Sequence, residues 1–89
     1  MILSTPLQSF TDISFQIFSN PLLGKVYIDF NYYMPKAYYE VFNKNGDLIK
    51  KGKNLSIRNT ISLDSFPTGM YTIKVQGETK SVAKSFLRF

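Results

Sequence analysis

The stretch Tyr39-Glu40-Val41-Phe42-Asn43-Lys44-Asn45-Gly46-Asp47-Leu48-Ile49 decides the fold of this chain. The dipeptide Asn45-Gly46 tolerates positive φ at both positions, as a two-residue type I′ hairpin turn requires. β-branched and aromatic residues stand on either side of it, and these residue types favour strands. We therefore predict a β-hairpin with strands over residues 37–43 and 47–51.

Similar short segments, divided by proline and glycine, make up most of the remaining chain. Residues 25–31 alternate between apolar and polar side chains, the pattern of a strand with one buried face. The same reasoning predicts strands over residues 13–18, 59–63, 70–76 and 79–88. The residues predicted to face the core are Ile13, Phe15, Ile17, Val26, Ile28, Phe30, Tyr39, Val41, Ile61, Leu63, Tyr71, Ile73 and Val75. The last strand keeps two phases open, with Val82 and Phe86 on one face and Ala83, Leu87 and Phe89 on the other.

Six to seven short strands with frequent turns predict an all-β fold, an antiparallel immunoglobulin-like β-sandwich. A small barrel of the OB type is the alternative. Pro67 and Gly69 suit the second and fourth positions of a type I turn that begins at Phe66. The length of 89 residues allows one domain. We expect residues 1–12, which are polar and rich in breakers, to be a linker from an upstream region, and residues 13–89 to be the domain.

The amino-acid composition argues against a catalytic function. The chain has no cysteine and no histidine, so thiolate nucleophiles, disulfides and the commonest general base are excluded. Asp29 and Glu40 are the one acid pair of interest, predicted on solvent faces of neighbouring strands, since paired carboxylates can hydrolyse glycosides. A sandwich this small offers little concave pocket. We expect no enzymatic activity, no metal and no cofactor.

The net charge of +5 raises the question of nucleic acid. A basic OB-type binder would need aromatic side chains interleaved with lysine on one sheet face. The alternation over residues 70–76 instead leaves only Thr72, Lys74 and Gln76 on the outward face. We therefore expect no nucleic-acid partner.

Four pieces of the chain, in this order, resemble a known family. They are Ile17-Phe18-Ser19-Asn20-Pro21 with the strand after it, Tyr39-Glu40-Val41-Phe42 through Gly46-Asp47-Leu48-Ile49, Leu63-Asp64-Ser65-Phe66-Pro67-Thr68-Gly69-Met70-Tyr71-Thr72-Ile73-Lys74-Val75, and a final strand with Lys80, Lys84 and Arg88. Together they cover residues 15–89 and resemble the C-terminal sorting domain of the type IX (Por) secretion system of Gram-negative bacteria. Two departures are Ser19, where the family often has proline, and the terminal Phe89, which is not basic.

The resemblance implies a sorting signal that directs an attached upstream cargo across the outer membrane through the type IX machinery. It implies transit through the periplasm, then a place on the cell surface or outside the cell, and removal of the domain by a sortase-like surface protease. The residues predicted to be recognised are Pro67, Gly69, Tyr71, Lys80, Lys84 and Arg88. Each has a structural alternative: the first three build a turn and the core, and the cations protect an edge strand from pairing with other chains.

Tyr32, Tyr33, Tyr38 and Tyr39 suggest a second function. A carbohydrate-binding or adhesive β-sandwich would use such a cluster as a stacking platform, provided that the rings are exposed and coplanar. Cross-strand aromatic pairs that stabilise a thin sandwich are the structural alternative. The oligomeric state and the identity of the cargo are not predicted.

Overall fold

The computed structural model describes residues 13–20 and 22–88, and the predicted linker 1–12, Pro21 and Phe89 lie outside them. Seven strands form in the described part: β1 (Phe15–Asn20), β2 (Lys25–Phe30), β3 (Tyr38–Phe42), β4 (Leu48–Lys53), β5 (Arg58–Ser62), β6 (Gly69–Gln76) and β7 (Ser81–Arg88). These residues contain no helix long and apolar enough to cross a membrane.

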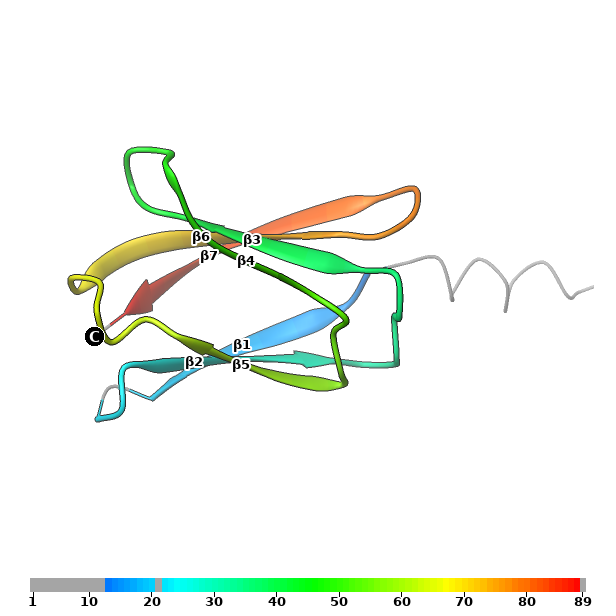
Figure 1. Cartoon of the computed structure of the whole chain (residues 1–89), viewed down its shortest axis with the longest axis horizontal. Coiled ribbons are helices and arrows are strands. Elements are labelled where there is room, and N and C mark those ends of the chain that lie inside the picture. Colours follow the sequence, from blue (N-terminus) through cyan, green and yellow to red (C-terminus); the bar gives the residue numbers. More distant parts are fainter. Residues whose placement is uncertain (1–12, 21, 89) are drawn as a thin grey trace, which may run out of the picture.

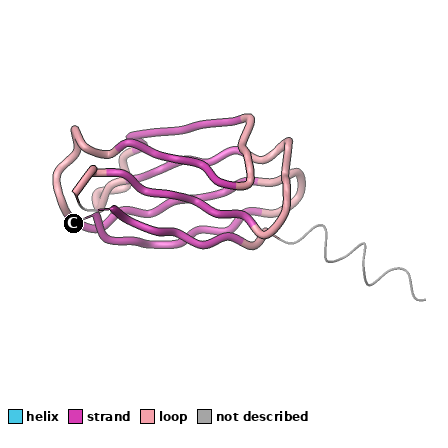
Figure 2. Tube along the Cα trace, turned by 90° about the horizontal axis from the view of Figure 1, so that it is seen from below, coloured by secondary structure: helices cyan, strands magenta, loops and turns pink. Residues whose placement is uncertain are grey.

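The strands build two layers, which Figure 1 shows one above the other. One sheet has the order β1-β2-β5 and the other β4-β3-β6-β7, and every pairing is antiparallel. The turns gather at the two ends of the long axis (Figure 2). The predicted immunoglobulin-like sandwich is thereby confirmed. Two separate sheets, rather than one closed sheet, exclude the barrel.

Period-two alternation carries the core between the sheets. The central strands β2, β3 and β6 each bury every second side chain, as the sequence predicted. The buried core consists of Phe15, Val26, Ile28, Phe30, Ala37, Tyr39, Val41, Leu55, Ile61, Leu63, Tyr71, Ile73, Val75 and Phe86. Phe86 is buried and Leu87 is exposed, so the last strand takes the phase that places Val82 and Phe86 inward.

The turn between β3 and β4 differs from the predicted type I′ turn. A type I′ turn needs positive φ at both Asn45 and Gly46. Gly46 has a φ of 86°, but Asn45 does not have a positive φ, because Asn54 is the only non-glycine residue with one among the described residues. The Gly46 amide donates to the Asn43 carbonyl oxygen at 3.0 Å, and the Asn43 amide to the Asp47 carbonyl oxygen at 3.0 Å. This is a longer loop in which a left-handed glycine follows a type I turn. The Asn43 side chain stabilises it by accepting from the amides of Asn45 and Asp47.

The turn between β5 and β6 also lies elsewhere than predicted. The Phe66 amide donates to the Leu63 carbonyl oxygen at 3.0 Å, so the hydrogen-bonded turn spans residues 63–66 and not 66–69. Asp64 and Ser65, which are strong turn formers, occupy its centre. Pro67 favours an extended Phe66, and the chain therefore leaves the turn there.

Candidate functional site

The two ends of the sandwich carry different residues. We call the end that contains Ile13, the first described residue, the proximal end, and the opposite end the distal end. At the proximal end, an added Cβ on Gly77 would lie 3.3 Å from Ile13 Cδ1 and 3.6 Å from Met34 Cε. The distal end, opposite to it, holds the turns at residues 22–24, 43–46 and 63–69 and the end of β7 (Figure 1). It is held together by the Leu63 amide, which donates to the Gly24 carbonyl oxygen at 2.9 Å.

Four of the six predicted signal residues meet at the distal end. Gly69 pairs with Arg88 across β6 and β7, and Tyr71 pairs with Phe86, whose ring centroid lies 6.0 Å away. The Tyr71 hydroxyl donates to the Pro67 carbonyl oxygen at 2.5 Å. Pro67 itself is exposed. The buried tyrosine therefore holds an exposed proline turn in place.

Lys84 and Arg88 point inward from β7 and bridge the two sheets. Lys84 Nζ donates to the Phe15 carbonyl oxygen at 2.5 Å and lies 4.6 Å from the centre of the Phe15 ring. Arg88 Nε donates to the Leu63 carbonyl oxygen at 2.6 Å. Inward-pointing charges on an edge strand prevent that edge from pairing with another chain. Both cations thus connect the edge strand β7 to main-chain atoms outside its own sheet.

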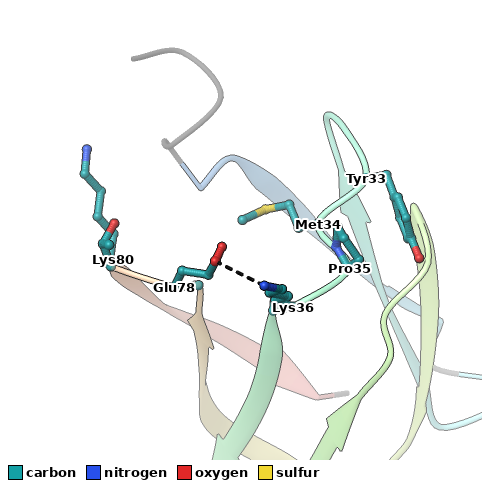
Figure 3. Close-up of a pocket in the computed structure, with 9 residues that line it drawn as sticks. Tyr33, Met34, Pro35, Lys36, Glu78 and Lys80 are labelled. Carbon is teal, nitrogen blue, oxygen red and sulfur yellow. Dashed lines mark ion pairs between the residues drawn. The ribbon is translucent and has the colours of Figure 1, made fainter. Parts of the chain in front are cut away.

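Lys80 lies apart from the other predicted signal residues, at the proximal end. It lines a hollow of about 360 Å³ together with Tyr33, Met34 and Glu78. Figure 3 shows Tyr33 and Met34 on one side of this hollow and Lys80 on the other, with the ion pair of Lys36 and Glu78 between them. That pair is long, at 3.8 Å, and exposed, so it contributes little stability.

The four tyrosines do not share one surface. Tyr39 belongs to the core, where burial raises the pKa of its hydroxyl, whereas Tyr38 points to the opposite face of β3. Tyr33 is exposed at the hollow of the proximal end, and Tyr32 is half-buried. Because Tyr39 is inaccessible and Tyr38 faces away from it, the exposed coplanar platform of a carbohydrate-binding module does not form.

The carboxylate pair is also separated, and its predicted place on neighbouring strands is wrong. Asp29 lies on β2 and Glu40 on β3, which belong to different sheets. Arg58 holds Asp29 with Nε and Nη2 at 2.7 and 2.5 Å. Within residues 13–20 and 22–88, no three His, Cys, Asp or Glu side chains group as metal ligands would.

Comparison with known families identifies the domain. The model of the family described as "Secretion system C-terminal sorting domain" matches residues 16–87. The chain belongs to this family. No curated protein matches the chain. The sorting domain is a C-terminal signal for type IX secretion, a role that is not catalytic, and nothing favours the carbohydrate-binding alternative.

Membership of the family also indicates which partners the sorting domain has and where it is exported. It implies an upstream cargo and the type IX machinery as partners. It implies export across the outer membrane to the cell surface or the extracellular space.

Replacing Lys84 by methionine tests its bridge to the other sheet. The aliphatic contacts remain, but the hydrogen bond to the Phe15 carbonyl oxygen is lost. We expect the sorting domain to lose about 1 kcal/mol of unfolding free energy, measured by urea denaturation. Lys53→Met, on the exposed face of β4, is the matched control and should change it by less than about 0.5 kcal/mol. Equal effects of the two variants would contradict a structural role for Lys84.

The ion pair of Asp29 and Arg58 predicts a dependence of stability on acid pH. The hydrogen bond from Arg58 lowers the pKa of Asp29 below its ordinary value of 3.8. The pair therefore stabilises the sorting domain at pH values above 3.8, and this contribution is lost as the pH falls through the lowered pKa. We expect the urea midpoint of Arg58→Met to lie below that of the wild type at neutral pH and to approach it as the pH falls through the lowered pKa of Asp29. A constant difference at all pH values would contradict the assignment.

Proposed function

We propose that the type IX machinery recognises the folded distal end of this domain, and that residues 13–89 are sufficient as the signal. The observation that carries this proposal is the pair of contacts made by Tyr71 and Arg88. Tyr71 holds Pro67, and Arg88 holds Leu63, so the turn and the last strand form one shaped surface. On this view Pro67 and Gly69 are displayed, whereas Tyr71, Lys84 and Arg88 position them.

The path of the chain supports recognition at this end. An upstream cargo joins the domain ahead of Ile13, at the proximal end, so it leaves the distal end uncovered. Pro67 and Thr68 are exposed there. A hollow of about 230 Å³ lies between residues 43–45 and 67–71, and it offers a concave surface to a partner. Lys80 faces away from this surface, and its part in the signal stays a prediction.

We also propose that the cargo crosses the periplasm and that a sortase-like surface protease then removes the domain. This step rests on the family resemblance. Mass spectrometry of an exported reporter tests it: the expected product lacks residues 13–89. Exported reporter that keeps the whole domain in every molecule would contradict removal.

Fusion to a reporter tests recognition at the distal end. The full chain, and separately residues 13–89, are joined to the C-terminus of a periplasmic fluorescent protein in a host with the type IX system. We expect both fusions to reach the surface or the medium in wild-type cells and to stay periplasmic in translocon-deficient cells. A folded fusion that stays periplasmic in both strains would contradict the proposal.

Two matched substitutions locate the recognised end. Thr68→Arg places a bulky cation on the exposed distal turn, and Thr79→Arg places the same group on the exposed turn between β6 and β7. Neither position belongs to the core. We expect Thr68→Arg to reduce the exported fraction severalfold at unchanged thermal stability and Thr79→Arg to leave it unchanged. The reverse result would assign recognition to the proximal end.

A further inference from the structure

The outer face of the sheet β4-β3-β6-β7, the upper layer in Figure 1, carries apolar and basic side chains in separate rows. The register pairs Phe42 with Leu48 and Met70 with Leu87, all on the side opposite to the core. Leu48, Met70 and Leu87 are each about half exposed, at 47%, 49% and 49%. Phe42 pairs with Thr72 across β3 and β6, so the two apolar pairs lie one step apart along the strands. Together they form a stepped apolar row near the distal end, with one pair on β4 and β3 and the other on β6 and β7.

The next rows of the same face are basic. Lys51, Glu40 and Lys74 stand side by side on β4, β3 and β6, and Lys53 follows on β4. Glu40 is the one carboxylate at the outward positions of these four strands, so the face carries three lysines against one acid, a net charge of +2. The two ion pairs found among residues 13–20 and 22–88 lie elsewhere, at Lys36–Glu78 and Arg58–Asp29. The three lysines are thus available to a partner.

The outer face of the other sheet differs, because its cations already have partners. Arg58 binds Asp29 and lies 5.8 Å from the centre of the Tyr27 ring. Lys25 Nζ donates to Ser62 Oγ at 2.6 Å. Lysines without an ion-pair partner next to an apolar row are therefore found on the four-stranded sheet. A protein that binds such a face carries negative charge opposite the lysines.

We propose that this face, with Phe42, Leu48, Met70 and Leu87 beside Lys51, Lys53 and Lys74, packs against a protein of the secretion machinery. The complementary surface of that protein carries an apolar strip bordered by carboxylates. The proposal rests on the proposed function, since it names the partner surface that the sorting signal meets.

The shape of the face favours a protein over an anionic membrane. The apolar side chains lie on a sheet with about half of their surface covered, whereas residues that enter a lipid interface project from it. Glu40 stands between Lys51 and Lys74, where lipid phosphates would repel it. A protein surface can offer a hydrogen-bond donor at that point.

Charge reversal on the face provides the test. Lys74→Glu, in the full chain, is compared with Lys36→Glu, which makes the same change of charge at the exposed proximal end. The probe is the detergent-solubilised outer-membrane translocon of the type IX host. We expect Lys74→Glu to weaken binding about fivefold or more, and added salt to weaken wild-type binding, because both act on charge pairs across the interface. Lys36→Glu should bind as the wild type does.

A second variant and a lipid probe make the outcome decisive. Leu87→Gln changes an exposed residue of the apolar row and is expected to weaken translocon binding with the fold intact.

Vesicles of equal parts phosphatidylethanolamine and phosphatidylglycerol are the lipid probe. Vesicle binding that Lys74→Glu abolishes, with translocon binding unchanged, overturns the proposal in favour of a membrane. Wild-type translocon binding by Lys74→Glu and Leu87→Gln overturns it, while loss of export in Thr68→Arg still upholds recognition at the distal end. Failure of the unmodified fusion to be exported overturns the proposed function itself.

Discussion

Gly24→Ala is expected to destabilise the sorting domain by about 3 kcal/mol, a large part of the total stability of a small domain. Two costs add at this position. Gly24 has a φ of +63°, where a side chain is strained. The Cβ of an alanine at this position would lie 2.8 Å from the Cα of Asp64 and 3.0 Å from Arg88 Nη2. A main-chain atom cannot move aside as a flexible side chain can, so the contact between the β1–β2 turn and residue 64 must open.

Gly46→Ala is the control for Gly24→Ala, because it shares the backbone strain without the crowding. Gly46 has a φ of +86° and nothing within 4 Å of an added Cβ. We expect a cost of about 1 kcal/mol. Urea denaturation of both variants at an unchanged slope measures the difference. Equal costs would show that the close approach of Gly24 to Asp64 does not contribute to stability.

The strands and the core could be predicted because alternation reports burial directly. In β2, Val26, Ile28 and Phe30 alternate with polar residues, and a one-residue shift of register would expose all three. The same constraint acts on β3 and β6, whose inward residues were also predicted. The interior of the sandwich therefore follows from period two alone.

Core residues outside the strands carry no such signal. Leu55 is buried although it follows both β4 and the predicted strand 47–51. Ala37 is buried just ahead of β3, and as the first residue of the predicted strand 37–43 it was not named as a core residue. Both turns were misassigned for a related reason, since Asn-Gly and Pro-x-Gly fit several turn types. The choice at Gly46 depended on the Asn43 side chain, which stabilises the longer loop by bonds to the main chain.

The residues of the candidate site could be named from the sequence, but not their directions. Lys84 lies between Val82 and Phe86 on the inward face of β7, and its charge obscured the alternation that would have revealed this. Its contact with Phe15 joins residues 69 positions apart, on different sheets. Adjacent Tyr38 and Tyr39 likewise looked like one cluster, although neighbouring residues of a strand point to opposite faces.

Phe86→Ala is expected to have the largest effect on export, because it removes the principal apolar contact between β7 and the core. Phe86 is 9% exposed and stacks on Tyr71, which holds the Pro67 turn. Loss of a buried phenylalanine costs about 3 kcal/mol or more. If the signal is a folded surface, the last strand and the distal turn lose their shape together, and the exported fraction of the reporter should fall to the level of translocon-deficient cells.

Ile57→Ala separates the loss of the fold from the mere loss of an apolar side chain, because Ile57 lies outside both surfaces proposed for recognition. Ile57 is 45% exposed, and its truncation should change the unfolding free energy by less than about 0.5 kcal/mol and leave export unchanged. Export by Phe86→Ala at the wild-type level, despite a measured loss of stability, would mean that the machinery reads an extended C-terminal segment rather than the sandwich. Loss of export in Phe86→Ala, partly restored at a lower growth temperature, would instead tie the signal to the folded state. The temperature dependence matters because destabilisation acts through the unfolded fraction, whereas a missing contact with the machinery would persist at every temperature at which the domain is folded.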